Sequence, residues 1–250
     1  MEPFFSVQLD IKNRKSIQEA LDYYIKPDVL EGDNKYYCED YDTKIKAHKR
    51  SFLNSTSNTL IINLKRFEFD FNTFRKYKVN DYCEFPLDLN IKPWTKEGIE
   101  EKEGKQEGSE ENEELIKEET QEEDKYQYEA VGVVVHSGGA EGGHYYSYIK
   151  DRQKNKWFEF NDTTVKPFDI KNLPEETFGG DGNRGNMMEN NDNFGGFYSR
   201  SRNAYLIIYQ RKNPLPYETI QINNTSDDLV NGIPQSVYQH ILDDNMLFMK

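Results

Sequence analysis

The chain has 250 residues, of which 31% are charged, and its formal net charge is −13. Its 17 tyrosines and 15 phenylalanines suffice for a sizeable core, and two cysteines, Cys38 and Cys83, are too few for a disulfide framework. No apolar run approaches the ~18 residues of a membrane span, and the N-terminus lacks the features of a secretory signal. We therefore expect an intracellular protein, cytoplasmic or nuclear, that does not bind a membrane.

Most of the negative charge lies in one low-complexity segment, residues 97–124. It holds 14 acidic residues and 3 lysines, a net charge of −11, which leaves −2 for the rest of the chain. A segment this polar and self-repelling does not pack into a core, so we expect a disordered acidic insertion. Because the rest of the chain has no basic stripe, nucleic acid is not an expected partner.

The remaining sequence favours an α+β fold that is rich in antiparallel strands. Residues 16–25 predict a helix with Ser16 as its N-cap and Glu19 completing a capping box. Hydrophobic alternation and turn residues predict extended segments over residues 35–53 (a two-stranded ribbon), 59–71, 76–89, 126–138, 144–151, 156–168 and 204–212.

Two further segments complete the predicted organisation. Residues 179–203 are rich in glycine and asparagine and are expected to form a second insertion. Residues 213–250 are a C-terminal extension, in which residues 236–249 have the apolar spacing of a helix.

A single histidine, His144, stands in an unusual setting. Four glycines precede it in the stretch GGAEGGHYYSYIK, residues 138–150, and a strand-like run follows. If residues 144–151 and 156–160 form a hairpin, Asn161 and Asp162 come back beside His144. A side-chain oxygen bonded to a histidine ring fixes its tautomer and orientation, as in the third member of a catalytic triad. The alternative is a histidine with a structural role at a strand start.

The glycines before His144 suggest where a substrate would lie. Gly142 and Gly143 would let an extended substrate backbone pass close to the base. We assign Tyr145 and His136, which lie beside the same turn, to this substrate-binding surface. For His136, a purely structural role is the alternative.

Several segments resemble, in order, the ubiquitin-specific proteases, which are papain-like cysteine deubiquitinases, and especially the very large family members. YEAVGVVVHSGGAEGGHYYSYIK, KWFEFNDTTV and NAYLIIYQRK resemble the family's His box, TLIINLKRFEFDF and NDYCEFPLDL the elements before it, and VLEGDNKYYCEDYDTKIKAHKR the fingers subdomain. The resemblance implies that residues 1–212 form fingers and palm. It also implies that His144 is the catalytic base, that Asn161 is the third triad member and that Asp162 assists.

The nucleophile of this family has no counterpart here. The family's cysteine box lies near the start of the domain and is followed by a helical thumb, and no part of this chain resembles either. Cys83, His144 and Asn161 follow the papain-like order, but Cys83 lies in an extended stretch that ends at Pro86. No helix N-terminus is available there to lower the thiol pKa. We therefore expect the nucleophile and the thumb to be missing from this chain.

The zinc site of many family members is also incomplete. Tyr41 stands three residues after Cys38, where the family's Cys-x-x-Cys pair has its second cysteine. One cysteine cannot build a tetrahedral site, so we expect no zinc and no other cofactor.

The expected function is therefore that of the C-terminal portion of a thiol-dependent deubiquitinase. The complete enzyme would hydrolyse isopeptide bonds after the C-terminal Gly-Gly of ubiquitin, with ubiquitin and ubiquitinated proteins as partners, and this chain alone would be inactive. One alternative is a catalytically inactive ubiquitin-binding module. Another is a scaffold that uses the acidic segment as an interaction tail.

Overall fold

The computed structural model describes residues 2–105, 124–180, 201–216, 229–230 and 233–248. The chain divides into two units, Met1–Leu215 and Pro216–Lys250. The predicted acidic insertion falls largely on residues 106–123, and the second predicted insertion on residues 181–200, and both ranges lie outside the described residues.

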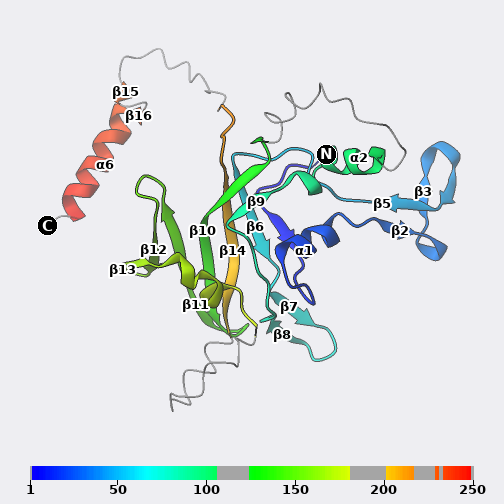
Figure 1. The fold of residues 1–250 in the computed structure, drawn as a ribbon, viewed down its shortest axis with the longest axis horizontal. Coiled ribbons are helices and arrows are strands. Elements are labelled where there is room, and N and C mark those ends of the chain that lie inside the picture. The colour runs from blue at the N-terminus through cyan, green and yellow to red at the C-terminus, as the bar shows by residue number, and fades with distance from the viewer. Residues whose placement is uncertain (1, 106–123, 181–200, 217–228, 231–232, 249–250) are drawn as a thin grey trace. The chain divides into compact units, whose positions relative to one another are not determined.

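The first unit is built around an eight-stranded sheet in the order β1-β6-β14-β10-β11-β12-β13, with β9 paired to β10 (Figure 1). The strands are β1 (Val7–Leu9), β6 (Thr59–Leu64), β9 (Asp88–Asn90), β10 (Gln127–Gly138), β11 (Gly143–Asp151), β12 (Lys156–Asn161), β13 (Thr164–Phe168) and β14 (Arg202–Arg211). β1 runs parallel to β6, and the other paired neighbours are antiparallel. The predicted β-rich α+β class and the two hairpins around β11 are confirmed.

One predicted strand is in fact two. Residues 156–168 form β12 and β13, joined by a turn at Asp162 and Thr163, rather than one continuous strand. Asp162 has a φ of 50°, the left-handed conformation that Asp and Asn adopt more readily than most residues. This turn therefore sets the place where β12 ends, directly after Asn161.

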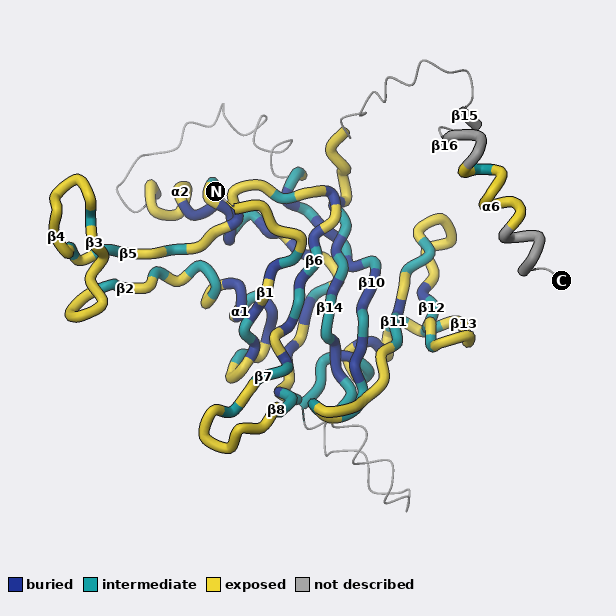
Figure 2. The backbone as a smooth tube through the Cα atoms, turned by 180° about the vertical axis from the view of Figure 1, so that it is seen from behind, coloured by how far each residue is buried: buried dark blue, intermediate teal, exposed yellow. Residues whose placement is uncertain are grey.

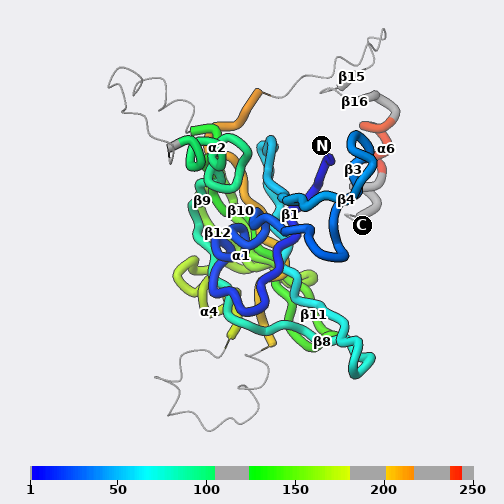
Figure 3. The backbone as a smooth tube through the Cα atoms, turned by 90° about the vertical axis from the view of Figure 1, so that its right-hand side faces the viewer, coloured from blue at the N-terminus to red at the C-terminus, as the bar shows by residue number. Residues whose placement is uncertain are grey.

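Helix α1 (Ile17–Tyr24) begins where the capping box predicted it. The Ser16 side-chain oxygen accepts a hydrogen bond from the Glu19 amide at 3.2 Å, and the Glu19 carboxylate accepts one from the Lys15 amide at 2.8 Å. Figure 3 shows α1 in front of the sheet. Its buried residues Ile17 and Leu21 belong to the same hydrophobic core as the inward-facing residues of β1 and β6.

The N-terminal part of the predicted disordered segment is instead helical. Helix α2 (Lys96–Lys105) buries Ile99, and the Thr95 hydroxyl accepts a hydrogen bond from the Gly98 amide at 3.2 Å near its start. In the described part of this unit, helix α4 (Leu173–Thr177) and short 3-10 helices are the other helical elements. The 3-10 helices are Gly32–Asn34, Glu39–Tyr41, Lys92–Trp94 and Ile170–Asn172.

An arm of short strands extends from the sheet and is mostly exposed (Figure 2). β2 (Asp28–Leu30) pairs with β5 (Ala47–Lys49), and β3 (Tyr36–Cys38) pairs with β4 (Thr43–Ile45). The β3–β4 pair is the ribbon predicted within residues 35–53. Cys38 lies in the last position of β3.

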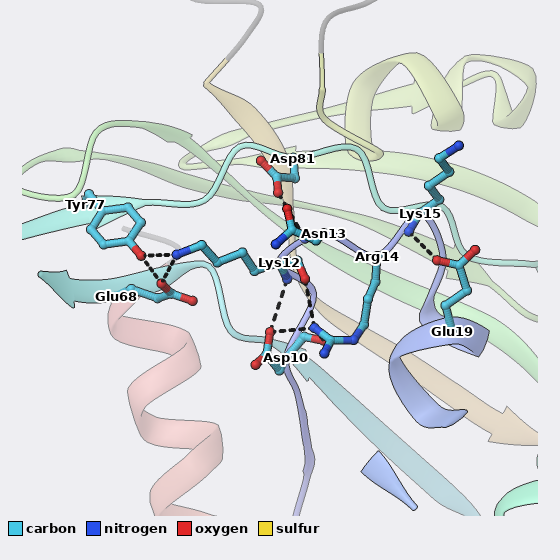
Figure 4. A network of polar contacts seen from close by, with 9 residues as sticks. All are labelled: Asp10, Lys12, Asn13, Arg14, Lys15, Glu19, Glu68, Tyr77 and Asp81. Atoms are coloured by element: carbon cyan, nitrogen blue, oxygen red, sulfur yellow. Dashed lines mark hydrogen bonds and ion pairs between the residues drawn. The ribbon is translucent and has the colours of Figure 1, made fainter. Parts of the chain in front are cut away.

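A further hairpin, β7 (Phe67–Asp70) with β8 (Arg75–Lys78), follows β6. Arg66 separates β6 from β7: its buried guanidinium donates to the backbone carbonyls of Ala204 at 2.6 Å and Val79 at 3.0 Å. Lys12, in the N-terminal segment, contacts both strands of the hairpin: its Nζ donates to Tyr77 Oη at 2.6 Å and forms an ion pair with Glu68 at 3.1 Å (Figure 4). These contacts fix the hairpin to the N-terminal segment.

The second unit contains β15 (Leu229–Val230), β16 (Ile233–Pro234) and helix α6 (Gln235–Phe248). The helix confirms the prediction for the C-terminal extension. Among the described residues, no helix combines the length and apolar character needed to cross a bilayer.

Candidate active site

The β11–β12 hairpin brings His144 and Asn161 together. Ser147 pairs with Phe160 in this hairpin. His144 and Asn161 therefore lie at the same end of the two strands. His144 Nε2 and Asn161 Oδ1 are 2.6 Å apart, and the His144 side chain is 46% exposed. The predicted contact between the two residues is confirmed, and the ring is accessible from solvent.

Asp162 is placed differently from Asn161. Its Oδ2 atom lies 4.0 Å from His144 Nε2, and its side chain is 76% exposed. This distance exceeds that of a hydrogen bond, so the carboxylate acts on the ring only through its charge, once the imidazole is protonated. Asn161 is therefore the one of the two whose side chain is within hydrogen-bond distance of His144.

The contact with Asn161 defines which ring nitrogen of His144 is free to react. An amide oxygen only accepts, so His144 Nε2 donates and carries the proton in the neutral ring. Nδ1 then holds a lone pair and is the atom that can accept a proton. The ring is stacked on Tyr146, with centroids 6.2 Å apart at 20°. Sequence reasoning missed Tyr146, although residues two apart in a strand lie on the same face.

The two glycines before His144 have different surroundings. At Gly143 an added Cβ would lie 2.5 Å from the Ser137 carbonyl oxygen and 2.6 Å from His136 Cε1, so only glycine fits. At Gly142 an added Cβ would meet nothing within 4 Å. Gly143 is thus required by the packing of this turn, whereas Gly142 leaves open space in which a ligand backbone has room.

His136 is not on the substrate-binding surface where we expected it. Its side chain is 4% exposed and packs against Phe67, at 5.1 Å between ring centroids, and Tyr145, at 4.6 Å. The imidazole is buried because Phe67 of β7 and Tyr145 of β11 cover it at the end of β10. Tyr145 is 49% exposed and remains on the surface. Burial and the nearby Lys78 charge lower the pKa of His136 to about 4.

The buried His136 predicts an acid-sensitive component of stability. Because its pKa is near 6.5 when the chain is unfolded and about 4 when folded, protonation favours the unfolded chain. We expect the free energy of unfolding to fall as the pH drops from about 6.5 towards 4, by up to ~3 kcal/mol. Urea unfolding at several pH values in this window should show a smaller decrease for His136→Phe. Equal pH dependence in both proteins would contradict the assignment.

The two cysteines of the chain lie in different surroundings. Cys83 is fully buried, and burial raises the pKa of its thiol to about 11, against the opposing effect of the Arg66 charge. Cys38 lies on β3 in the arm, which Figures 1 and 2 show on the far side of the sheet from β11. Within the described part of the chain, no three His, Cys, Asp or Glu side chains are grouped to hold a metal ion.

Comparison with known proteins identifies the family. The family model described as "Ubiquitin carboxyl-terminal hydrolase" matches residues 11–209. The chain belongs to this family. The resemblance to the ubiquitin-specific proteases seen in the sequence is thereby confirmed.

The curated ubiquitin carboxyl-terminal hydrolases that it matches are much longer. Human ubiquitin carboxyl-terminal hydrolase 34 is 36% identical over 220 residues, covering 85% of this chain and 6% of the relative. Mouse ubiquitin carboxyl-terminal hydrolase 9X is 33% identical over 250 residues, covering 94% and 10%. The probable hydrolase FAF of Drosophila melanogaster is 34% identical over 262 residues, covering 99% and 9%. The chain thus spans a tenth or less of these relatives.

Solved structures share the fold of this ubiquitin carboxyl-terminal hydrolase chain. The SAGA DUB module containing Ubp8, bound to monoubiquitin, aligns with a TM-score of 0.57 at 23% identity, covering 86% of this chain and 36% of that one. The module bound to ubiquitin aldehyde has the same TM-score at 24% identity, covering 86% and 37%. These similarities show that the chain shares the fold of a little over a third of each of those chains.

Proposed function

We propose that this chain is the C-terminal part of a thiol-dependent deubiquitinase catalytic domain. The reaction is hydrolysis of the isopeptide bond that follows the C-terminal Gly-Gly of ubiquitin. The observation that carries the proposal is the accessible His144 ring, held by Asn161 at 2.6 Å in a chain of this family. Ubiquitin and ubiquitinated proteins are the proposed partners, supported by the ubiquitin-bound structures that share the fold.

His144 acts as base and then as acid in this proposal. Nδ1 takes the proton of a cysteine thiol, and the thiolate attacks the carbonyl carbon of the last glycine of ubiquitin. The imidazolium gives its proton to the departing lysine amine, and water then hydrolyses the thioester. Asn161 holds Nε2–H throughout, so the ring keeps its orientation between the two steps.

The nucleophile in this proposal comes from outside the chain described. Cys83 is buried with a raised thiol pKa, and Cys38 lies in the arm. The chain covers 6% of human ubiquitin carboxyl-terminal hydrolase 34, so the relative has ample sequence beyond the matched region. The proposal assigns the nucleophile to the segment that precedes this region.

A fusion protein tests the proposal. In this chimera, the segment of human ubiquitin carboxyl-terminal hydrolase 34 that precedes the matched region is placed ahead of residues 1–250. We expect a ubiquitin probe with a thiol-reactive group at its C-terminus to label the chimera and not the isolated chain, since loss of a nucleophile reduces the rate by about 10⁶-fold. Labelling of the isolated chain at Cys83 would contradict the proposal.

A ubiquitin-binding module without activity is the second candidate, favoured by the burial of Cys83. Calorimetric titration of the isolated chain with ubiquitin distinguishes the binding module, which binds ubiquitin, from the scaffold, which does not. A folded chimera that binds ubiquitin but does not cleave it would support the binding module. A chain that neither binds nor cleaves would support the scaffold.

A further inference from the structure

We propose that Lys78 is a positioning residue that holds the glycine turn before His144 in the register needed for the contact with Asn161. The inference rests on the proposed function of His144, because it concerns the placement of that base. Lys78 is the last residue of β8, on a different hairpin from the one that carries His144 and Asn161.

Three backbone carbonyls surround the Lys78 ammonium group. Nζ donates to the carbonyl oxygens of His136 at 2.9 Å and Gly138 at 3.4 Å, and also to that of Ser201. A lysine ammonium has three donors, one for each of these acceptors while Nζ is protonated. One group thus joins the end of β10, where the glycine turn begins, to the residue that precedes β14.

The carbonyls held by Lys78 lie in the part of the ladder that places His144. Gly138 pairs with Gly143, and Ser137 pairs with His144, so the end of β10 fixes the backbone of His144. Asn161 comes from β12, which does not pair with β10. A shift of the turn relative to β12 would therefore lengthen the 2.6 Å contact between the two side chains.

Lys78 is itself held in a fixed place. Its backbone pairs with that of Phe67, and its neighbour Tyr77 contacts Lys12 and Glu68 (Figure 4). The carbonyl oxygen of Val79, the residue after Lys78, accepts a hydrogen bond from the Arg66 guanidinium. The hairpin therefore presents the ammonium group from a firmly anchored strand.

The electrostatics of Lys78 favour a positioning role over a general contribution to stability. Among the described residues, no carboxylate forms an ion pair with it. Burial and the Arg66 charge lower the pKa of Lys78 to about 7, so the site disfavours the charged form. A half-buried ammonium without a countercharge has a desolvation penalty that an apolar side chain would avoid. What the ammonium adds is the set of directed bonds to the turn.

The test uses the 250-residue chain and nitrogen-15 NMR of its histidine rings, with the His144 signal assigned by its loss in His144→Gln. In the unmodified chain, neutral His144 should show a single tautomer with the proton on Nε2, as the Asn161 contact requires. Lys78→Met should lose this single tautomer and show exchange between both. Lys78→Arg, which keeps a cation with several donors, should retain it. Lys76→Met is the matched control, because Lys76 lies on the same strand with its side chain exposed.

The outcomes separate positioning from folding. Circular dichroism and the amide spectrum of β10 and β11 report whether each variant is folded. If Lys78→Met does not fold, Lys78→Leu, which also lacks any donor, is measured in its place. A folded variant lacking the ammonium that keeps the single Nε2–H tautomer would overturn the proposal. Because the readout needs neither ubiquitin nor a nucleophile, such a result leaves the proposed function intact, and a failure of the chimera is distinguishable from a failure of Lys78 to hold the turn.

Discussion

Replacing His144 with alanine in the chimera is expected to lower kcat for hydrolysis of a ubiquitin C-terminal amide by about 10⁶-fold, the size of effect seen when a triad base is removed. Without the imidazole, no group is placed to take the thiol proton or to return it to the leaving amine. Initial rates with a fluorogenic ubiquitin C-terminal amide measure the change.

The partners of His144 should give a graded series. Asn161→Ala removes the acceptor at 2.6 Å and is expected to lower kcat by about 10²- to 10⁴-fold, since the base remains but its orientation is lost. Asp162→Asn should lower it by less than Asn161→Ala, because the carboxylate lies 4.0 Å away and is exposed. Equal effects at Asn161 and Asp162 would show that orientation by Asn161 is not the dominant contribution.

The adjacent glycines should respond in opposite ways to alanine. Gly143→Ala places a Cβ 2.5 Å from the Ser137 carbonyl oxygen, where the backbone must shift, and should lower the free energy of unfolding by ~2–3 kcal/mol. Gly142→Ala meets nothing within 4 Å and should change it by less than ~0.5 kcal/mol. Urea unfolding of the isolated chain measures both, and similar losses at the two positions would refute the packing argument.

The same pair separates packing from substrate recognition in the chimera. Gly142→Ala should raise KM for the ubiquitin amide although the fold is unaffected, because its methyl group projects into the space proposed for the Gly-Gly tail. An unchanged KM would remove Gly142 from the substrate-binding surface.

Local signals in the sequence predicted the elements that carry the site. The Ser16 and Glu19 capping box predicted α1: the Ser16 side chain caps the helix as predicted, and the Glu19 carboxylate accepts from the Lys15 amide, one residue before the N-cap. Counting residues along the two strands of the predicted hairpin placed Asn161 beside His144, because register along an antiparallel pair follows from the turn between its strands. These predictions needed only residues within about one hairpin of each other.

What the sequence did not predict depends on contacts between distant segments. Helix α2 was taken for disordered chain because of its charge, yet Glu97 contacts Tyr126 and Lys125, which lie beyond the acidic run. His136 was assigned to the surface because nothing local shows that Phe67 would cover it. The role of Lys78 likewise rests on carbonyls of Gly138 and Ser201, far away in the chain.

The position of β14 has a consequence for synthesis of the protein. β14 is the last strand of the sheet in chain order, yet it lies between β6 and β10 and joins them. At about 5–20 residues per second, a ribosome takes on the order of ten seconds to extend the chain from the end of β10 to the end of β14. During that interval β6 and the β10–β11 hairpin have open edges that can pair with another nascent chain. The strands β6 and β10 can therefore be joined through β14 only after Arg211 has emerged from the exit tunnel.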